Sequence, residues 1–412
     1  MLNARVCIVT AGHLSTCPRM LKAADALAGA GYEVRVVSTN HTPWATVADR
    51  QVLATRGWAH TVVDYDRDTA RATQVATGVR FRTARAASAT LGADRAPMPV
   101  VIRAYSRIHD ELVRAVADEP TDFIYGGTTG ALAAVAESAE RMRVPYGIDF
   151  EDLHSGEQAP DCEVTNVLAA RIERQVIAGA AFATAGSPMI ADGYEQAYGV
   201  RPIPVHNTFS IAPPQSGDQS TDRPIRLYWF SQTLGAGRGL EDVVRGIGRM
   251  GGWVELHLRA RKIPSYIDSL TLLQREVAPN LHIVYHDPAA PDDMVRLAQP
   301  YDAGLACDEP LGLSRQLCLA NKIFTYLAAG VPVIMSRTPA QAALETCLEG
   351  AAFGYDCGSV DGIADILSCL SSDYDQWKQA RCAARVAAER RWHWEHPEDR
   401  GALLAAVAGA IR

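Results

Sequence analysis

The stretch at residues 231–239 has the composition of a phosphate-binding turn. It reads SQTLGAGRG, and its three Gly would let backbone N–H groups approach an anion closely. Arg238 adds a positive charge at the mouth of the helix expected next. A plain Gly-rich turn between a strand and a helix would look the same, so both interpretations stay open. A dinucleotide fingerprint is excluded because Leu240 occupies the place of its third Gly, and no Walker A sequence occurs.

A second stretch, residues 319–334, reads LANKIFTYLAAGVPVI. Its pattern predicts an amphipathic helix that ends at Gly330, and Pro332 prevents the helix from continuing into the next strand. Lys322 falls in the first turn of this helix. It is either a solvated surface residue or a cation that pairs with a phosphate or an acid.

A third stretch, residues 149–157, is an acidic loop that follows a predicted strand. Carboxylates and His can take a proton from an acceptor and stabilise an oxocarbenium-like centre. Loops at the carboxyl ends of parallel strands face the ligand crevice. We therefore expect the loop to lie across a cleft from Arg238 and to take part in chemistry, with a solvated acidic loop as the alternative. Its titratable residues are Asp149, Glu151, Asp152, His154 and Glu157.

Composition narrows the class of protein. The 412 residues, 48% hydrophobic and 21% charged, are ordinary for a soluble globular chain of two or three domains. No apolar run is long enough to predict a transmembrane helix, and the net charge of −7 argues against a nucleic-acid-binding surface. The nine Cys form no CxxC pair, so we expect buried free thiols. The N-terminal MLNARVCIVTAG predicts a buried strand rather than a signal peptide, and hence a cytoplasmic protein.

Short apolar runs alternate with Ala-rich helical runs, which predicts an α/β fold with parallel sheets. The first unit is a strand at Arg5–Thr10, a helix over 19–30 and a strand over 33–38. Residues 41–99 have weak periodicity and predict one strand near 78–82 with long loops. Further strands are expected at 123–125, 145–150, 182–185, 225–230, 254–258, 283–285, 303–306 and 331–335. Further helices are expected at 101–118, 130–142, 163–177, 239–250, 291–298, 321–328 and 376–391, the last continuing past Trp394.

A Pro/Ser/Gly-rich stretch at 207–224 interrupts this alternation and predicts a linker. We therefore expect two doubly wound, Rossmann-like domains facing across a cleft, over residues 1–206 and 225–385. The final helix, within 386–412, could cross back to the first domain.

Three segments, taken in this order, resemble the GT-B-fold glycosyltransferases, especially the retaining family-four type. VCIVTAGHLSTCPRMLKAADALAGAGYEVRVVS resembles the first βαβ unit of these enzymes. RIERQVIAGAAFATAGSPMIADGYEQAYG, followed by Val205-His206-Asn207, resembles the run before their interdomain linker. LANKIFTYLAAGVPVI resembles their segment NK-x-F-E-Y-L-A-A-G-x-P-V-I. The resemblance covers nearly the whole chain apart from about residues 41–99.

The resemblance implies that residues 1–206 bind an acceptor and residues 225–385 bind a nucleotide-diphosphate sugar, whose sugar is transferred with retention. Arg238 falls on the position of a basic residue that holds the donor diphosphate. No metal and no cofactor are implied beyond the nucleotide-sugar co-substrate. The residues expected at the diphosphate and sugar are Gly12, Arg238, Gly312, Leu313, Ser314 and Lys322, and those expected at the nucleoside are His286, Asn321 and Thr325.

The sequence departs from the family in two places. Thr325 stands where a Glu commonly grips the ribose, and the usual partner eight residues upstream is Leu317. In PYGIDFEDLHSGE, Glu151 stands where the family has a catalytic His. Asp152 follows it, and His154 comes three positions after Glu151. These three are the catalytic candidates, with Glu151 first.

Two short DxD patterns, at residues 64–66 and 373–375, match those of metal-dependent glycosyltransferases of the other main fold. Neither follows a convincing buried strand, so we expect surface loops. The composition, rich in Ala and Arg, favours a small-molecule acceptor of a natural-product pathway. A lipid or polysaccharide acceptor stays open, although no strongly basic amphipathic helix for membrane docking stands out. A homo-oligomer, a sugar-nucleotide epimerase, a glycoside phosphorylase and a degenerate sugar-nucleotide-binding subunit stay open. The nucleotide base, the sugar and the acceptor atom also stay open.

Overall fold

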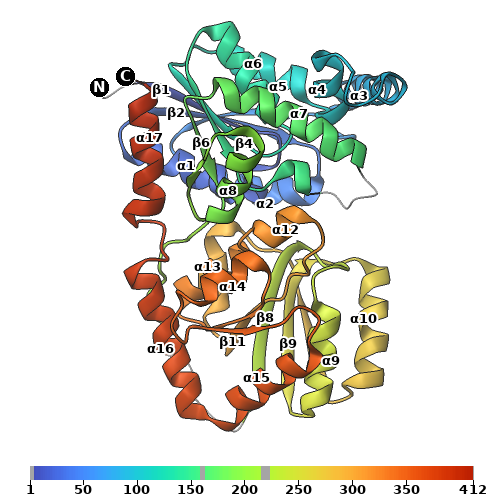
Figure 1. The fold of residues 1–412 in the computed structure, drawn as a ribbon, viewed down its shortest axis with the longest axis vertical. Helices are drawn as coiled ribbons and strands as arrows, with labels where there is room; N and C mark the ends of the chain where they lie inside the picture. The colour runs from blue at the N-terminus through green and yellow to red at the C-terminus, as the bar shows by residue number, and fades with distance from the viewer. Residues whose placement is uncertain (1–3, 158–162, 215–222, 412) are drawn as a thin grey trace. The chain divides into compact units, whose positions relative to one another are not determined.

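The computed structural model describes residues 4–157, 163–214 and 223–411. By their contacts these residues divide into two compact units. An N-terminal unit runs to His206 and also includes Gly312–Ser314 and the residues from Pro397 onward. A C-terminal unit contains Asn207–Leu311 and Arg315–His396. Each unit is a parallel sheet with helices packed on it, which confirms the predicted fold class of two doubly wound α/β domains (Figure 1).

The N-terminal sheet has seven parallel strands in the order β3-β2-β1-β4-β5-β6-β7. The chain builds outward from β1 in one direction to β3 and then in the other from β4 to β7, so the connections reverse between β1 and β4. The strands are β1 (Arg5–Thr10), β2 (Glu33–Asn40), β3 (Ala59–Asp64), β4 (Phe123–Gly127), β5 (Tyr146–Phe150), β6 (Phe182–Ala185) and β7 (Ile203–Pro204).

Helices of the N-terminal unit follow most of these strands. Ser187 begins one of them, because its side chain accepts a hydrogen bond from the Ile190 N–H and Pro188 occupies the first turn. The helices are α1 (Pro18–Gly29), α2 (Pro43–Leu53), α3 (Arg71–Leu91), α4 (Met98–Tyr105), α5 (His109–Ala117), α6 (Leu132–Met142), α7 (Glu163–Gly179), α8 (Pro188–Tyr198) and α17 (Ala402–Ala410).

The C-terminal sheet has six parallel strands in the order β10-β9-β8-β11-β12-β13, with the reversal between β8 and β11. The strands are β8 (Ile225–Thr233), β9 (Val254–Arg261), β10 (Leu281–His286), β11 (Ala303–Ala306), β12 (Val333–Ser336) and β13 (Ala352–Tyr355). The helices are α9 (Leu240–Met250), α10 (Pro264–Val277), α11 (Met294–Ala298), α12 (Leu313–Leu317), α13 (Asn321–Ala329), α14 (Pro339–Glu345), α15 (Val360–Ser372) and α16 (Tyr374–Arg390).

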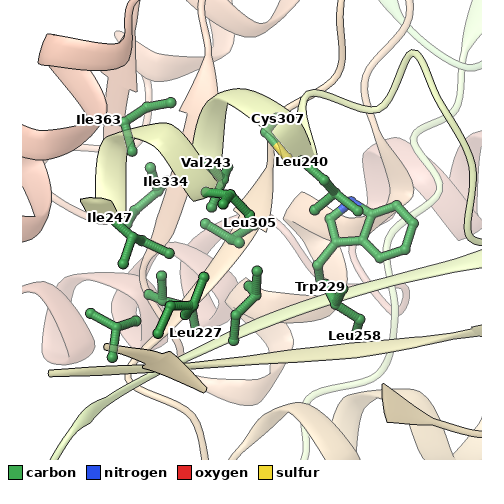
Figure 2. Close-up of a cluster of buried hydrophobic side chains, with 14 of the residues drawn as sticks. Leu227, Trp229, Leu240, Val243, Ile247, Leu258, Leu305, Cys307, Ile334 and Ile363 are labelled. Carbon is green, nitrogen blue, oxygen red and sulfur yellow. The ribbon is translucent and has the colours of Figure 1, made fainter. Parts of the chain in front are cut away.

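One hydrophobic core of the C-terminal unit lies between α9 and the sheet (Figure 2). Leu240, Val243 and Ile247 recur at helical spacing and are fully buried against Leu227 and Leu305 of the central strands β8 and β11. Each such side chain contributes about 1.5–3 kcal/mol relative to exposure. The packing of α9 on the sheet therefore holds both ends of the loop that joins β8 to α9.

Residues 41–99 differ most from the sequence prediction. The strand expected near residues 78–82 is wrong, because these residues lie inside α3. Val79 and Phe81 look strand-like, but the helix carries six Ala and four Arg, which are strong helix formers. The strand β3 and the helix α2 were missed altogether.

Two long helices were also predicted wrongly. The helix expected over 101–118 is interrupted at Ser106, which is extended and donates its hydroxyl to the Gly130 carbonyl at 2.7 Å. The last helix does not continue past Trp394, because α16 ends at Arg390 and a new helical segment begins at Pro397. Part of the expected linker, residues 215–222, lies outside the described residues.

The buried-thiol prediction holds for only some of the cysteines. Cys7, Cys17 and Cys307 are buried free thiols, and Cys318 is half-buried. Four others are exposed, two of them in turns and two on the helices α15 and α16, and Cys162 lies outside the described residues. The exposed ones are Cys347, Cys357, Cys369 and Cys382. Over the described ranges, no helix is both long and apolar enough to span a bilayer.

Candidate active site

The carboxyl ends of β8 and β11 form the switch point of the C-terminal sheet. The chain leaves β8 toward β9 and leaves β11 toward β12, on opposite sides. Ligands of doubly wound sheets bind in the crevice outside the strands at such a point. Arg238 lies in the loop after β8, and Asp308 lies in the loop after β11. The loop singled out by its three Gly is therefore at the ligand-binding position of this sheet.

The loop after β8 owes its shape to two glycines. Gly237 and Gly239 have φ of 74° and 69°, in the left-handed region that side chains disfavour. A Cβ on Gly239 would also lie 1.9 Å from the carbonyl oxygen of Cys307, so only Gly fits between the two loops. The Gly239 N–H donates to the Glu309 carboxylate at 3.2 Å, which ties the start of α9 to the loop after β11.

Three cations gather around Asp308. The Nζ of Lys322 lies 3.2 Å and a guanidinium nitrogen of Arg238 lies 3.8 Å from the Asp308 carboxylate. Burial alone would raise the pKa of Asp308, but the charges of Lys322, Arg238 and Arg315 outweigh it and hold that pKa below its usual value. Asp308 is therefore ionised at neutral pH, and the cations outnumber it at the switch point.

Lys322 is not the solvated surface residue that its type alone would suggest. It is 8% exposed, in the first turn of α13, and its Nζ lies 5.8 Å from the ring centre of Trp229. A buried ammonium needs a counter-charge, and Asp308 supplies it. The alternative interpretation of Lys322 as a surface lysine is wrong.

Tyr326 fixes the helix that carries Lys322. Its hydroxyl donates to the Tyr228 carbonyl of β8 at 3.0 Å, with the Leu305 carbonyl of β11 also within reach at 3.3 Å. Its ring covers Gly304, where a Cβ would come within 2.2 Å of the ring carbons. One side chain, placed one turn after Lys322, therefore bonds α13 to both central strands.

The three nucleoside candidates have different surroundings. Asn321 precedes Lys322 and is half-buried, so the two are side by side on α13. Thr325 is fully buried and donates its hydroxyl to the Asn321 carbonyl at 3.2 Å, so it presents no surface to a ligand here. His286 ends the edge strand β10, where its ring bonds to His257 at 2.9 Å. Because β9 separates β10 from β8, His286 is not brought to the switch point.

The remaining phosphate candidates belong to the N-terminal unit. The Gly12 N–H donates to the Thr10 hydroxyl at 3.3 Å, just after β1. Gly312–Ser314 also group with this unit, and Ser314 is buried. The helix that begins at Leu313 is only five residues long. Their roles at a diphosphate stay predictions.

The acidic loop begins at Asp149, at the end of β5. Asp149 is buried and forms a two-point ion pair with Arg19, at 2.6 and 2.7 Å, and it accepts the Thr184 hydroxyl at 2.6 Å. Its carboxylate is thus used inside the fold. The loop is held to β6 because the Gly186 N–H donates to the Glu151 carbonyl, which lies too near Gly186 for any Cβ there.

Glu151 and Asp152 have carboxyl groups whose pKa values are raised. For Glu151 the causes are burial first and then the negative charge of Asp152. For Asp152 they are burial and the charge of Glu157. A carboxyl with a raised pKa can exchange a proton near neutral pH, which suits general acid–base chemistry.

His154 is held as a cation. Its Nδ1 bonds to the Glu157 carboxylate, with the Thr129 hydroxyl 3.2 Å away. Burial alone would lower the pKa of His154, but the hydrogen bond and charge of Glu157 outweigh it and raise the pKa to about 9. His154 is therefore protonated at pH 7, which leaves Glu151 and Asp152 as the candidate bases.

Neither DxD pattern forms a pair of free carboxylates. Asp64 is the last residue of β3 and accepts the Thr69 hydroxyl, and Asp66 is buried and accepts the Asp68 N–H, so this pattern is not the surface loop we expected. Both carboxylates shape the turn after β3. Asp373 begins α16 by accepting the Gln376 N–H. Among the residues described, no group of three or more His, Cys, Asp or Glu could hold a metal ion.

Comparison with known proteins gives matches in structure alone. No protein-family model matches the chain, and no curated protein sequence matches it. HepE of Anabaena, solved with UDP and glucose, matches with a TM-score of 0.67 at 15% identity over 99% of each chain. Sucrose-phosphate synthase of Thermosynechococcus elongatus matches with a TM-score of 0.65 at 11% identity, over 99% of this chain and 100% of that one.

A glycosyltransferase of Rickettsia africae matches with a TM-score of 0.63 at 9% identity, over 100% of this chain and 98% of that one. The fold is GT-B. The GT-B likeness extends over both units, including residues 41–99, where the sequence resemblance is absent. At these identities the likeness establishes the fold and leaves the choice of substrate to the residues of the site.

Sequence reasoning missed several residues of the GT-B chain's C-terminal site. Asp308, Glu309 and Arg315 all contact the loop after β8 or its cations. The sequence did hold a signal for Asp308 and Glu309, because both come just after the predicted strand at residues 303–306, where a parallel sheet binds its ligand. Arg315 gave no such signal, since its role depends on a 2.6 Å hydrogen bond to the distant Gly237 carbonyl.

Proposed function

We propose that the chain is a glycosyltransferase that takes its sugar from a nucleotide-diphosphate-sugar donor. The observation that carries this proposal is the group of Arg238, Lys322 and Arg315 around one carboxylate at the switch point of the C-terminal sheet. A group of three cations, at the place where doubly wound sheets bind ligands, suits a diphosphate. HepE, which shares the fold, has been solved with UDP-glucose, which supports a uridine nucleotide as the first candidate.

The cations would stabilise the leaving group. When the glycosidic bond breaks, the nucleoside diphosphate gains negative charge, and fixed positive charges stabilise that state most. Arg238 is more available to a ligand than Lys322, because its side chain is 33% exposed and its ion pair with Asp308 is long, at 3.8 Å. Lys322 is buried and held by Asp308, so Asp308 is a positioning residue. We propose that these cations act without a metal, helped by Ser314 and the N–H groups of Gly12, Gly312 and Leu313.

We assign the acceptor's proton to the acidic loop of the N-terminal unit. Glu151 is the first candidate for the proton acceptor, and its raised pKa supports this. Asp152 is the second candidate. The protonated His154 would supply positive charge rather than accept a proton.

The finer features of the reaction rest on the sequence resemblance. We propose transfer with retention, because residues 319–334 resemble the retaining family. We also propose a small-molecule acceptor of a biosynthetic pathway, a cytoplasmic enzyme, and a nucleoside contact from Asn321, the one nucleoside candidate that is neither fully buried nor away from the switch point.

The proposal is tested by calorimetry with UDP, GDP and dTDP and their sugars, followed by assays of donor turnover. A glycosyltransferase should bind one of the three nucleoside diphosphates. Without an acceptor, it should slowly hydrolyse the corresponding nucleotide sugar and release the free sugar. An epimerase would change the sugar without releasing it, and a degenerate binding subunit would release nothing. Failure of all three nucleotides to bind the intact chain would contradict the proposal.

A further inference from the structure

Helix α3 presents its more apolar side to solvent. Six residues at helical spacing lie on one exposed stripe: Arg71, Val75, Val79, Arg82, Ala86 and Ala89. Val75 is 51% exposed and Val79 47%. The side of α3 that faces the domain instead buries the small or polar residues Thr77, Gly78, Ala84 and Ser88. A helix on a soluble protein normally has the opposite arrangement.

Polar contacts hold the inner side of α3 in place. Arg107 donates to the Thr77 hydroxyl at 3.0 Å and also to the Gln74 carbonyl. Arg80 pairs with Glu111 and with Asp110. Because these contacts anchor the helix, Val75 and Val79 are not needed for its attachment. Both side chains are therefore available to a partner.

The charge of the stripe indicates what kind of partner that is. Helix α3 carries four Arg and no acidic residue, and one of the four, Arg80, is paired with Asp110 and Glu111. Arg71 and Arg82 lie on the exposed stripe with the two Val side chains. A second copy of this face would bring Arg against Arg, which is unfavourable. The stripe is complementary to a surface that is apolar within and anionic outside.

We propose that α3 docks the N-terminal unit on an anionic lipid surface, with Val75 and Val79 at the acyl boundary and Arg71 and Arg82 at the headgroups. With 21 residues the helix is about 30 Å long, enough to lie along the interface. Figure 1 shows α3 at the outer edge of its unit, beside α4. A strand and loops were expected here, so the helix itself was not predicted. The inference is independent of the proposed function, because its test measures binding to vesicles.

The test is co-sedimentation of the full chain with phosphatidylcholine vesicles, with and without phosphatidylglycerol. We expect binding to the anionic vesicles alone, weakened by salt. R71Q/R82Q should bind about 25-fold less tightly, since each Arg near such a surface contributes about fivefold. V75S/V79S should also lose most of the binding. The controls are L272S, which removes an exposed Leu from α10, and R249Q, which removes an exposed Arg from α9. Both should bind like wild type.

Equal binding to the two kinds of vesicle, or unchanged binding of both stripe variants, would overturn the proposal. So would sedimentation velocity showing a dimer that V75S/V79S abolishes, because a second copy would then cover the stripe. All four variants change exposed side chains, and unchanged thermal unfolding would show that each is folded.

Discussion

Replacing Arg238 by Ala should weaken the binding of nucleoside diphosphates and leave the fold intact. A hydrogen bond to a charged group contributes about 1.5–3 kcal/mol. The Arg238 side chain is 33% exposed, so solvent screening favours the lower half of that range. We therefore expect a loss of about 1.5–2 kcal/mol, or about 10- to 30-fold in Kd. Calorimetric titration of UDP into both proteins measures this directly.

Two matched variants sharpen the Arg238 experiment. Arg238→Lys keeps the charge but loses the two-pronged geometry, so its Kd should fall between those of wild type and Arg238→Ala. Arg249→Ala removes an exposed Arg from the far end of α9, the helix that Arg238 precedes, and should change nothing. If Arg238→Ala melts like wild type and binds UDP as tightly, Arg238 does not contact the diphosphate. If wild type binds no nucleotide at all, the proposed function fails instead.

The other predictions concern the buried charges and the acidic loop. Lys322→Met should destabilise the C-terminal unit by about 3 kcal/mol, because it leaves Asp308 short of a counter-charge. The double change Lys322→Met with Asp308→Leu should cost less than the two single changes combined. Additive losses in urea unfolding would show that the pair does not interact. Glu157→Gln should lower the pKa of His154, measured by NMR titration of the ring; an unchanged pKa would contradict the pairing. The folded-state pKa of about 9 is above the unfolded value, so the stability that His154 contributes is complete below about pH 6.5 and is lost as pH rises through 9. Over this pH range wild type should therefore lose more stability than Glu157→Gln. Glu151→Gln should lower turnover by about 100-fold with little change in donor affinity, and near-normal turnover would remove Glu151 from the chemistry.

Local patterns in the sequence predicted the framework well. β1, β6 and β11 have the predicted bounds, because strands that are buried on both faces of a parallel sheet read as short continuous apolar runs. The Arg238 loop was found for a similar reason, since its Gly residues report a backbone that side chains cannot adopt. The contacts of Asp308 and Arg315 could not be found, because they join residues that are distant in sequence.

The error in α3 has a different physical origin. Val75 and Val79 of this helix face outward. The usual rule that apolar residues mark the buried side therefore does not recover the helical period of α3. The burial of Thr325 was missed because a Thr can satisfy its hydroxyl on its own helix, here on the Asn321 carbonyl. In both cases tertiary contacts decided what local patterning left open.

The bond from Tyr326 to both central strands has a consequence for the dynamics of the C-terminal unit. Binding loops usually open at little cost, independently of the core beneath them. Here the helix that bears Lys322 cannot leave β8 and β11 unless the Tyr326 ring also leaves its place over Gly304. The backbone amides of α13 should thus exchange with deuterium only when the whole unit unfolds, at the same slow rate as those of the innermost strands.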